Sequence, residues 1–442
     1  MMTPRASVTY LLPTLVAASL ASPTAYGKSE ILEGQSGTIS EVGDVVQIAL
    51  PAAGLIGALW IGDTEGAWQV TKGVAATAAI THTLKFGVER LRPDGTESNS
   101  FPSGHTSAAF SGAAFIHHRY GNAYGIPAYA AAAFVGGSRI WANRHYMDDV
   151  LAGGSIAVMT SLYFTDPYAQ TDLVIAPSLG EDHIGLALSY TPGLAGNKGP
   201  RAEREKSHDW GQQDKPLNNS YTLMIGGFDT DTNYIRDKQE TGFDLNGFSK
   251  ESEPNTYASA LVNWGTGKQQ YLSFRFTPLE ARDTSILNQD IGFNGKRYAA
   301  GSEVIAAYRS WNLSADYMFN LMPKSDWIVN VGAGISLIDQ WIRLDDLEGG
   351  NLGEFNDFFI VPAAAAELGY RFTPAVKASL GYRITGLSDF DSSAFWGDVT
   401  YQINERWAAS LFYGQLEQTS DTDEYYNDAR FNFAGFAVTY SF

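Results

Sequence analysis

The segment KFGVERLRP, residues 85–93, is followed by PSGH at residues 102–105 and by SRIWANRHYMDD at residues 138–149. The side chains that stand out in them are Lys85, Arg92, Arg139, His105, His145 and Asp149. A set of three cations, two histidines and a carboxylate can hold a phosphate dianion, attack it and protonate the leaving group. These segments therefore predict one helical domain built around a phosphate site.

The spacing within the first segment predicts a helix. Residues 70–91 are rich in Ala, Val and Leu, and Pro93 would end such a helix. Lys85 and Arg92 are seven residues apart, which is two helical turns, so both are expected to point at one ligand.

The other two segments predict groups placed at helix ends. The turn Pro102–Gly104 leads into an expected helix over Thr106–His118, and N–H groups at a helix start attract anions. His105 is thus placed to donate a proton to a phosphate oxygen. His145 and Asp149 are four residues apart, so on one helix they would be neighbours. A carboxylate on one imidazole nitrogen fixes the tautomer and leaves the other nitrogen free to attack.

Each of these residues has an ordinary explanation when taken alone. A single histidine most often caps a helix or bonds locally, and a His/Asp or Lys/Arg pair most often lies on a solvated surface. The remaining histidines have no comparable neighbours, and they are His82, His117, His118, His183 and His208. For the pair His117-His118 we expect a favourable interaction with a helix dipole and no metal site.

Taken together and in this order, the three segments resemble the signature of the type 2 phosphatidic acid phosphatase superfamily. That superfamily also includes bacterial acid phosphatases and vanadium haloperoxidases. Its pattern is Lys-x6-Arg-Pro, then Pro-Ser-Gly-His, then Ser-Arg-x5-His-x3-Asp, and every position is matched here. The resemblance covers roughly residues 40–165.

The resemblance implies a role for each matched residue. His145 would be the nucleophile that forms a phosphohistidine, and Asp149 would orient it. His105 would protonate the leaving oxygen and then activate water. The phosphate would be held by Lys85, Arg92, Arg139, Ser103 and the N–H of Gly104. The three cations would replace a metal, so no cofactor is expected, and the roles of Arg144 and Asp148 stay open.

The composition and the N-terminal residues limit the possible domain organisation and partners of the chain. A chain of 442 residues exceeds one ordinary domain, it has no cysteine, and its formal charge of −18 argues against nucleic acid as a partner. Arg5, an apolar run over Tyr10–Leu20 and small residues after it predict a signal peptide over 1–27. A phosphatase-like helical domain is then expected over 28–168. The apolar segment Val45–Ile61 is a candidate membrane span, although we expect a soluble or peripheral bundle.

The second half of the chain has a different pattern of apolar and polar residues. A hairpin is expected from 172–177 and 184–190, and a polar linker follows it within 169–218. Over 219–442 apolar residues alternate with polar ones, as in 326–337. Alternation is typical of transmembrane barrel strands, and it also occurs in soluble β-sandwiches.

Ten strands are expected here, at about 220–229, 257–265, 268–278, 303–319, 326–342, 357–372, 375–387, 393–403, 406–418 and 430–442. Short turns on one rim, long acidic loops on the other (345–354 and 417–428 among them) and a final Phe442 resemble a bacterial outer-membrane barrel. The final residue would be part of the signal to the barrel-assembly machinery.

The sequence thus predicts a multidomain α and β protein, with an all-α phosphatase domain and a transmembrane antiparallel barrel of about ten strands. The expected activity is metal-independent hydrolysis of phosphomonoesters or pyrophosphates, on phosphorylated lipids or small phosphate esters. The expected location is the outer membrane, with the helical domain in the periplasm. Two alternatives stay open. One is a vanadate-dependent haloperoxidase using the same pocket, and the other is a pore or anchor with an inert helical domain.

Overall fold

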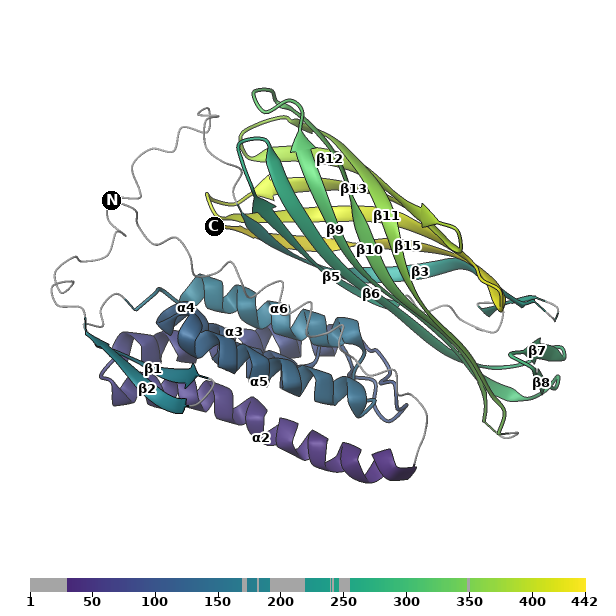
Figure 1. Ribbon diagram of the computed structural model, residues 1–442, viewed down its shortest axis with the longest axis horizontal. Coiled ribbons are helices and arrows are strands. Elements are labelled where there is room, and N and C mark those ends of the chain that lie inside the picture. The colour runs from purple at the N-terminus through teal and green to yellow at the C-terminus, as the bar shows by residue number, and fades with distance from the viewer. Residues whose placement is uncertain are drawn as a thin grey trace. The chain divides into compact units, whose positions relative to one another are not determined.

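The computed structural model describes residues 30–168, 173–180, 183–190, 219–238, 240, 242–245, 255–347 and 350–442. They divide into two compact units, one before and one after residue 209 (Figure 1). The expected signal peptide, 1–27, and most of the expected linker, from 191 to 218, lie outside the described residues.

The first unit contains a helical bundle with α4 at its centre. The helices are α2 (Glu30–Trp60), α3 (Thr64–Gly87), α4 (Gly104–Tyr120), α5 (Asn122–Trp141) and α6 (Met147–Phe164). The α4 helix packs against the other four helices. Its small residues Ala109, Ala113 and Ala114 are fully buried, because only small side chains let several helices approach one helix closely.

The end of α3 differs from the prediction. The helix stops at Gly87, and Val88 is extended with φ −126° and ψ 97°. Beyond it the backbone pairs with a later segment: the Ser100 N–H donates to the Arg90 carbonyl and the Arg92 N–H to the Glu97 carbonyl. The expected helix up to residue 91 is therefore wrong, and Lys85 and Arg92 do not share a helix face.

Only α2 among the described helices is long and apolar enough to cross a membrane, over Thr38–Trp60 with a mean hydropathy of 1.7. It includes the candidate span expected at Val45–Ile61. Of its apolar window, 17% is buried against the rest of the protein.

The hairpin expected after the helices is present. It consists of β1 (Leu173–Gly180) and β2 (His183–Tyr190), which pair antiparallel with Leu173 opposite Tyr190. Its first strand continues three residues beyond the predicted end at 177.

The second unit is a closed antiparallel barrel, as predicted. Its ten strands are β3 (Ser220–Asp237), β5 (Asn255–Gly265), β6 (Gln270–Ile286), β9 (Glu303–Asn320), β10 (Trp327–Asp346), β11 (Leu352–Arg371), β12 (Val376–Leu387), β13 (Phe390–Gln402), β14 (Trp407–Asp421) and β15 (Tyr425–Ser441). Pairing of β15 with β3 closes the barrel, with Ser441 opposite Ser220. Short strands β4 (Phe243–Asp244), β7 (Ile291–Phe293) and β8 (Lys296–Tyr298) lie at the other rim.

The strands present an apolar outer face. Along β10, Val331 and Ile335 are 37% and 49% exposed, whereas their sequence neighbours Asn330 and Ser336 are buried. The alternation read from residues 326–337 is thus confirmed, and it matches the pattern of barrels that face lipid.

The acidic segments 345–354 and 417–428 were expected to be loops, and this is wrong. The strands β10 and β11 each have 20 residues and are joined by five residues, while β14 and β15 are joined by three. A membrane crossing needs about 9–11 residues. The ladder continues past that length because paired strands satisfy their own backbone hydrogen bonds.

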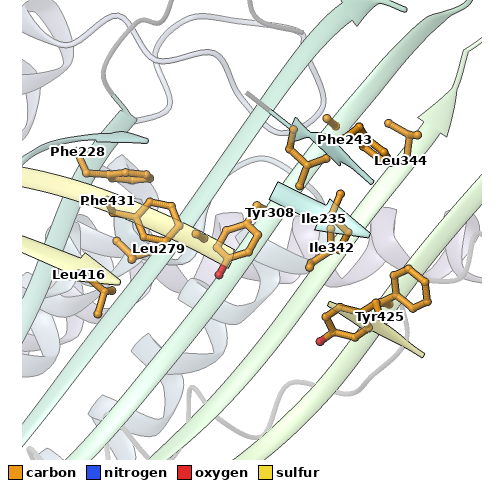
Figure 2. Close-up of a cluster of buried hydrophobic side chains, with 14 of the residues drawn as sticks. Phe228, Ile235, Phe243, Leu279, Tyr308, Ile342, Leu344, Leu416, Tyr425 and Phe431 are labelled. Carbon is orange, nitrogen blue, oxygen red and sulfur yellow. The ribbon is translucent and has the colours of Figure 1, made fainter. Parts of the chain in front are cut away.

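Side chains fill the lumen toward the rim opposite the chain ends (Figure 2). The rings of Tyr308 on β9 and Phe431 on β15 lie 5.4 Å apart, although three strands separate them around the barrel. Gln340 on β10 accepts hydrogen bonds from Ser420 at 2.5 Å and from Tyr425 at 3.0 Å, on β14 and β15. Such contacts cross the lumen and close this part of it.

Candidate active site

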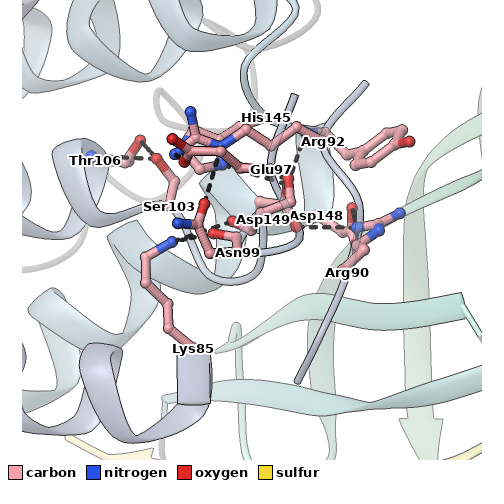
Figure 3. A network of polar contacts seen from close by, with 12 residues as sticks. Lys85, Arg90, Arg92, Glu97, Asn99, Ser103, Thr106, His145, Asp148 and Asp149 are labelled. Atoms are coloured by element: carbon pink, nitrogen blue, oxygen red, sulfur yellow. Dashed lines mark hydrogen bonds and ion pairs between the residues drawn. The ribbon is translucent and has the colours of Figure 1, made fainter. Parts of the chain in front are cut away.

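The structure brings the predicted site residues together from four elements and one loop. Lys85 lies in the last turn of α3, Arg92 in the following loop, Ser103 and Gly104 at the start of α4, Arg139 in the last turn of α5, and His145 and Asp149 at the start of α6. Figure 3 shows the part of this network around His145 and Asp149.

His145 and Asp149 meet across the N-terminus of α6. The helix begins at Met147, so the expectation of a shared helix is wrong for His145. Asp149 Oδ2 accepts from the Tyr146 N–H at 2.8 Å and from Ser100 Oγ at 2.5 Å, and it lies 3.5 Å from His145 Nδ1. Burial lowers the pKa of His145, while the hydrogen bond to Asp149 opposes the shift. The imidazole is therefore neutral near pH 7, as a nucleophile requires.

Arg90 is the cation that binds the Asp149 carboxylate behind His145. This role was not predicted from the sequence. Its Nη1 lies 2.9 Å from Asp149 Oδ1 and 2.6 Å from Asp148 Oδ1, and its guanidinium stacks 3.8 Å from the centre of the Tyr146 ring. Burial alone would raise the pKa of Asp149, but Arg90 and the hydrogen bonds to the carboxylate hold it below its usual value. Two adjacent carboxylates beside a histidine were a signal that a buried cation was needed.

Lys85 and Arg92 share one hydrogen-bonding partner, Asn99. Lys85 Nζ donates to the Asn99 carbonyl at 2.6 Å, and Arg92 Nε donates to the Asn99 side-chain oxygen at 3.0 Å. Arg92 also pairs with Glu97 at 3.1 Å. Burial lowers the pKa of Lys85 to about 8, and the nearby Arg92 contributes.

Arg139 and His105 share a partner that the sequence did not suggest. Asp44 Oδ1, on α2, lies 2.8 Å from Arg139 Nη1 and 3.1 Å from His105 Nε2. Arg139 also donates to the Ser40 carbonyl at 2.6 Å. Burial and the nearby Arg139 lower the pKa of His105 to about 4.

Ser103 makes structural contacts within the protein. Its side chain is fully buried, and Oγ caps α4 by accepting from the Thr106 N–H at 3.4 Å. It also accepts from the Thr106 hydroxyl at 2.9 Å. Its N–H donates to the Asp149 carbonyl at 2.9 Å. Gly104 is the first residue of α4 and lies against the Lys85 side chain. Ser103 thus ties the turn to α6, and Gly104 places the helix start beside the lysine.

His117 and His118 lie in the last turn of α4, as the expected helix-dipole interaction requires, but the charged form is disfavoured at His118. His118 is half-buried with its Nδ1 2.8 Å from Ser161 Oγ, and desolvation lowers its pKa to about 3. A neutral imidazole makes no charge–dipole interaction. His117 is buried, with Nε2 2.9 Å from Asn122 Oδ1.

The pH dependence of phosphate binding should follow Lys85. Because only the protonated amine attracts phosphate, kcat/KM is expected to fall as pH rises through about 8, the pKa of Lys85. In Lys85→Arg the side chain stays protonated to higher pH, so the pH at which kcat/KM falls should rise by more than about one pH unit. Lys72→Arg on the same helix is the control and should leave the profile unchanged. If kcat/KM fell at the same pH in Lys85→Arg as in the wild type, the fall could not be assigned to Lys85.

A second prediction concerns the contact between α4 and α6. A Cβ at Gly153 would lie 2.5 Å from the Ser103 carbonyl oxygen, so Gly153→Ala must push the Ser103–Gly104 turn away from α6. We expect a loss of about 1–3 kcal/mol in stability and about tenfold or more in kcat/KM. Gly137→Ala is the control, since no atom lies within 4 Å of its Cβ position. Circular dichroism melting measures the stability, and steady-state kinetics measures kcat/KM. Equal stability and activity of Gly153→Ala and Gly137→Ala would refute the close contact.

Helices that place a buried histidine–carboxylate pair among three cations define a phosphate-handling domain. Residues 66–170 match the model of the PAP2 superfamily, and this part of the chain is a PAP2 superfamily domain. It precedes the ten-stranded barrel in the same chain.

Two characterised proteins are similar to this chain. Lipid A 1-phosphatase of Porphyromonas gingivalis is 40% identical over 141 residues, covering 27% of this chain and 32% of that protein. Lipid A 4'-phosphatase of Helicobacter pylori is 28% identical over 179 residues, covering 37% of this chain and 90% of that protein. The chain thus spans about a third of the length of the first relative and most of the second.

Solved structures show partial similarity to this chain. LpxE of Aquifex aeolicus matches 34% of this chain and 92% of its own length, with 17% identity and a TM-score of 0.27. The outer membrane protease OmpT of Escherichia coli matches 52% of this chain and 98% of its own length, with 11% identity and a TM-score of 0.32.

Proposed function

We propose that this chain is a phosphatase that hydrolyses phosphomonoesters of membrane lipids through a phosphohistidine at His145. The observation that carries the proposal is the buried imidazole of His145, which lies 3.5 Å from the buried Asp149 carboxylate and near the positive charges of Lys85 and Arg92. The two lipid A phosphatases support a lipid phosphate as the substrate class.

The proposed reaction has two steps. In the first, His145 Nε2 attacks phosphorus, the bond from phosphorus to the leaving oxygen breaks, and His105 gives its proton to that oxygen. In the second, neutral His105 takes a proton from water, which attacks the phosphohistidine and releases phosphate. The negative charge of a bound phosphate raises the pKa of His105 above its value of about 4 and so loads the proton that the first step needs.

Each remaining group stabilises charge in these steps. Lys85, Arg92 and Arg139 would neutralise the phosphoryl oxygens, and charge stabilisation of this kind supplies most of the rate enhancement in phosphoryl transfer. The ionised Asp149, held by Arg90, would stabilise the positive imidazolium of His145 during the attack.

We also propose an outer-membrane location with the helical domain in the periplasm. The apolar outer face of the closed barrel supports it. Ser220 and Ser441 pair with each other, so both ends of the barrel lie at one rim. The connections at this rim, 266–269, 321–326, 372–375 and 403–406, have four to six residues, whereas the two longest connections of the barrel, 238–254 and 287–302, lie at the other rim. In outer-membrane barrels the short turns face the periplasm. The side chains that cross the lumen count against a pore as the main function.

Phosphate release from a substrate panel with EDTA present tests the activity. The panel holds p-nitrophenyl phosphate, phosphatidic acid, phosphatidylglycerol phosphate, undecaprenyl pyrophosphate and lipid A 1,4'-bisphosphate, each lipid in mixed micelles. We expect a lipid monoester to be hydrolysed with the highest kcat/KM. Vanadate would fit the same pocket, so peroxide-dependent bromination with added vanadate is assayed in parallel. Bromination without phosphate release from any substrate would contradict the proposal.

A further inference from the structure

Asp44 is a carboxylate in the site for which the proposed reaction has no use. It lies on α2, and its side chain is half exposed. Its Oδ1 contacts two groups at once, Arg139 Nη1 at 2.8 Å and His105 Nε2 at 3.1 Å. In the proposed reaction Arg139 holds a phosphoryl oxygen and His105 meets the leaving oxygen. The carboxylate therefore lies between the two groups that a phosphate ester must reach.

The hydrogen bonds of Arg139 show what a ligand has to displace. Nε donates to Ser138 Oγ at 3.1 Å, Nη2 to the Ser40 carbonyl at 2.6 Å, and Nη1 to Asp44. Three of the five N–H donors of the guanidinium thus have a protein acceptor. A phosphate oxygen that takes the Nη1 hydrogen bond now given to Asp44 must displace this carboxylate. Asp44 is the exposed side chain among them, so it is the partner that can leave.

The backbone of α2 is held tightly at this point, although the Asp44 side chain is exposed. A Cβ at the preceding residue, Gly43, would lie 2.5 Å from Ser138 Oγ and 2.6 Å from Arg139 Nη2. The helix therefore sits directly on the Ser138–Arg139 turn, and the position of the Asp44 carboxylate follows from backbone packing. A rotation of the Asp44 side chain can break its two contacts without moving the helix.

We propose that Asp44 is a displaceable carboxylate that competes with phosphate for Arg139 and His105. Without phosphate bound, Asp44 holds both side chains in place. A phosphate ester displaces it, and the carboxylate returns when inorganic phosphate leaves. Two negative charges about 4 Å apart repel each other, so Asp44 lowers the affinity for every phosphate anion, product included. Its effect would be to limit product inhibition in a site with three cations. This inference rests on the proposed phosphatase function.

The test is the affinity of the full chain in detergent for inorganic phosphate, measured by isothermal titration calorimetry at pH 7. Asp44→Asn keeps the shape of the side chain and removes its charge. We expect its Kd for phosphate to be about tenfold lower than that of the wild type, with kcat changed by less than about threefold. Asp44→Ala should tighten binding in the same direction.

Glu41→Gln is the matched control, because it removes one negative charge from the same helix at an exposed position one turn away. It should change the Kd by less than about twofold, as expected for a screened charge. Melting curves of all variants establish that they are folded.

The possible outcomes separate this proposal from the phosphatase function. Phosphate binding that is equal in the wild type, Asp44→Asn and Glu41→Gln would overturn the displacement and leave the function intact. A large loss of kcat in Asp44→Asn with unchanged phosphate affinity would also overturn it, because Asp44 would then position His105. A wild type and variants that all fail to bind phosphate would contradict the proposed function itself.

Discussion

His145→Ala is expected to lower kcat for phosphate release by about 10⁴-fold or more, because loss of a nucleophile removes the covalent route entirely. The same substitution should abolish labelling of the protein by a substrate that carries radioactive phosphate. In the wild type the label should be stable in alkali and released by acid, as a phosphorus–nitrogen bond is. Rapid quenching into alkaline detergent followed by gel autoradiography measures it.

The control for this prediction is His82→Ala, which removes an exposed histidine from α3 in the same helical unit. It should keep the activity and the label. If His145→Ala kept a tenth of the wild-type rate, or if the label resisted acid and survived in His145→Ala, the phosphohistidine mechanism would be wrong. Labelling in His105→Ala should persist and decay more slowly, because His105 activates water in the second step.

Arg90→Met is expected to destabilise the helical unit by about 3–5 kcal/mol, the usual cost of leaving one partner of a buried ion pair alone. The side chains of Arg90, Asp148 and Asp149 are 9%, 1% and 0% exposed, so water cannot replace the lost cation. Activity should fall about 100-fold or more, because Asp149 would no longer be held as a carboxylate behind His145. Unfolding in urea followed by circular dichroism at 222 nm reports the helical unit.

A double substitution makes the prediction for Arg90 sharper. Asp148→Asn removes one of the two carboxylates, so Arg90→Met combined with Asp148→Asn should recover part of the stability lost in Arg90→Met. Arg144→Met is the matched control, since Arg144 is 46% exposed and pairs with Asp94 at 3.1 Å. It should cost less than about 1 kcal/mol. Equal losses in Arg90→Met and Arg144→Met would contradict the role assigned to Arg90.

The pH dependence of stability gives an independent check on the same cluster. The pKa of Asp149 is lower in the folded protein than in the unfolded chain, where it is about 3.9. Its contribution to stability is therefore complete above pH 4 or so and is lost as pH falls through the folded pKa. In Arg90→Met the folded-state pKa of Asp149 should rise, so the stability lost on acidification should be smaller than in the wild type.

The chemical groups of the site could be predicted from the sequence because they sit at fixed spacings in three short segments. The strands of the barrel were also predictable, since alternation at period two survives wherever one face meets lipid and the other meets the lumen. The ends of the helices and strands were predicted incorrectly. The α3 helix stops before Arg92, and the barrel strands continue through acidic segments, because backbone pairing with the segment that follows decided both.

The sequence by itself predicted a cluster of cations, histidines and carboxylates, the helical domain that holds them, and the ten-stranded barrel that follows. Only the tertiary structure decided their partners. Arg90 reaches Asp148 across 58 residues, and Asp44 reaches Arg139 across 95. Neither contact has a local signature, because a charge on a helix is an ordinary solvated residue until packing buries it against another. Packing of α2 on α5 and of the α3–α4 loop on α6 turns Asp44 and Arg90 into parts of the site.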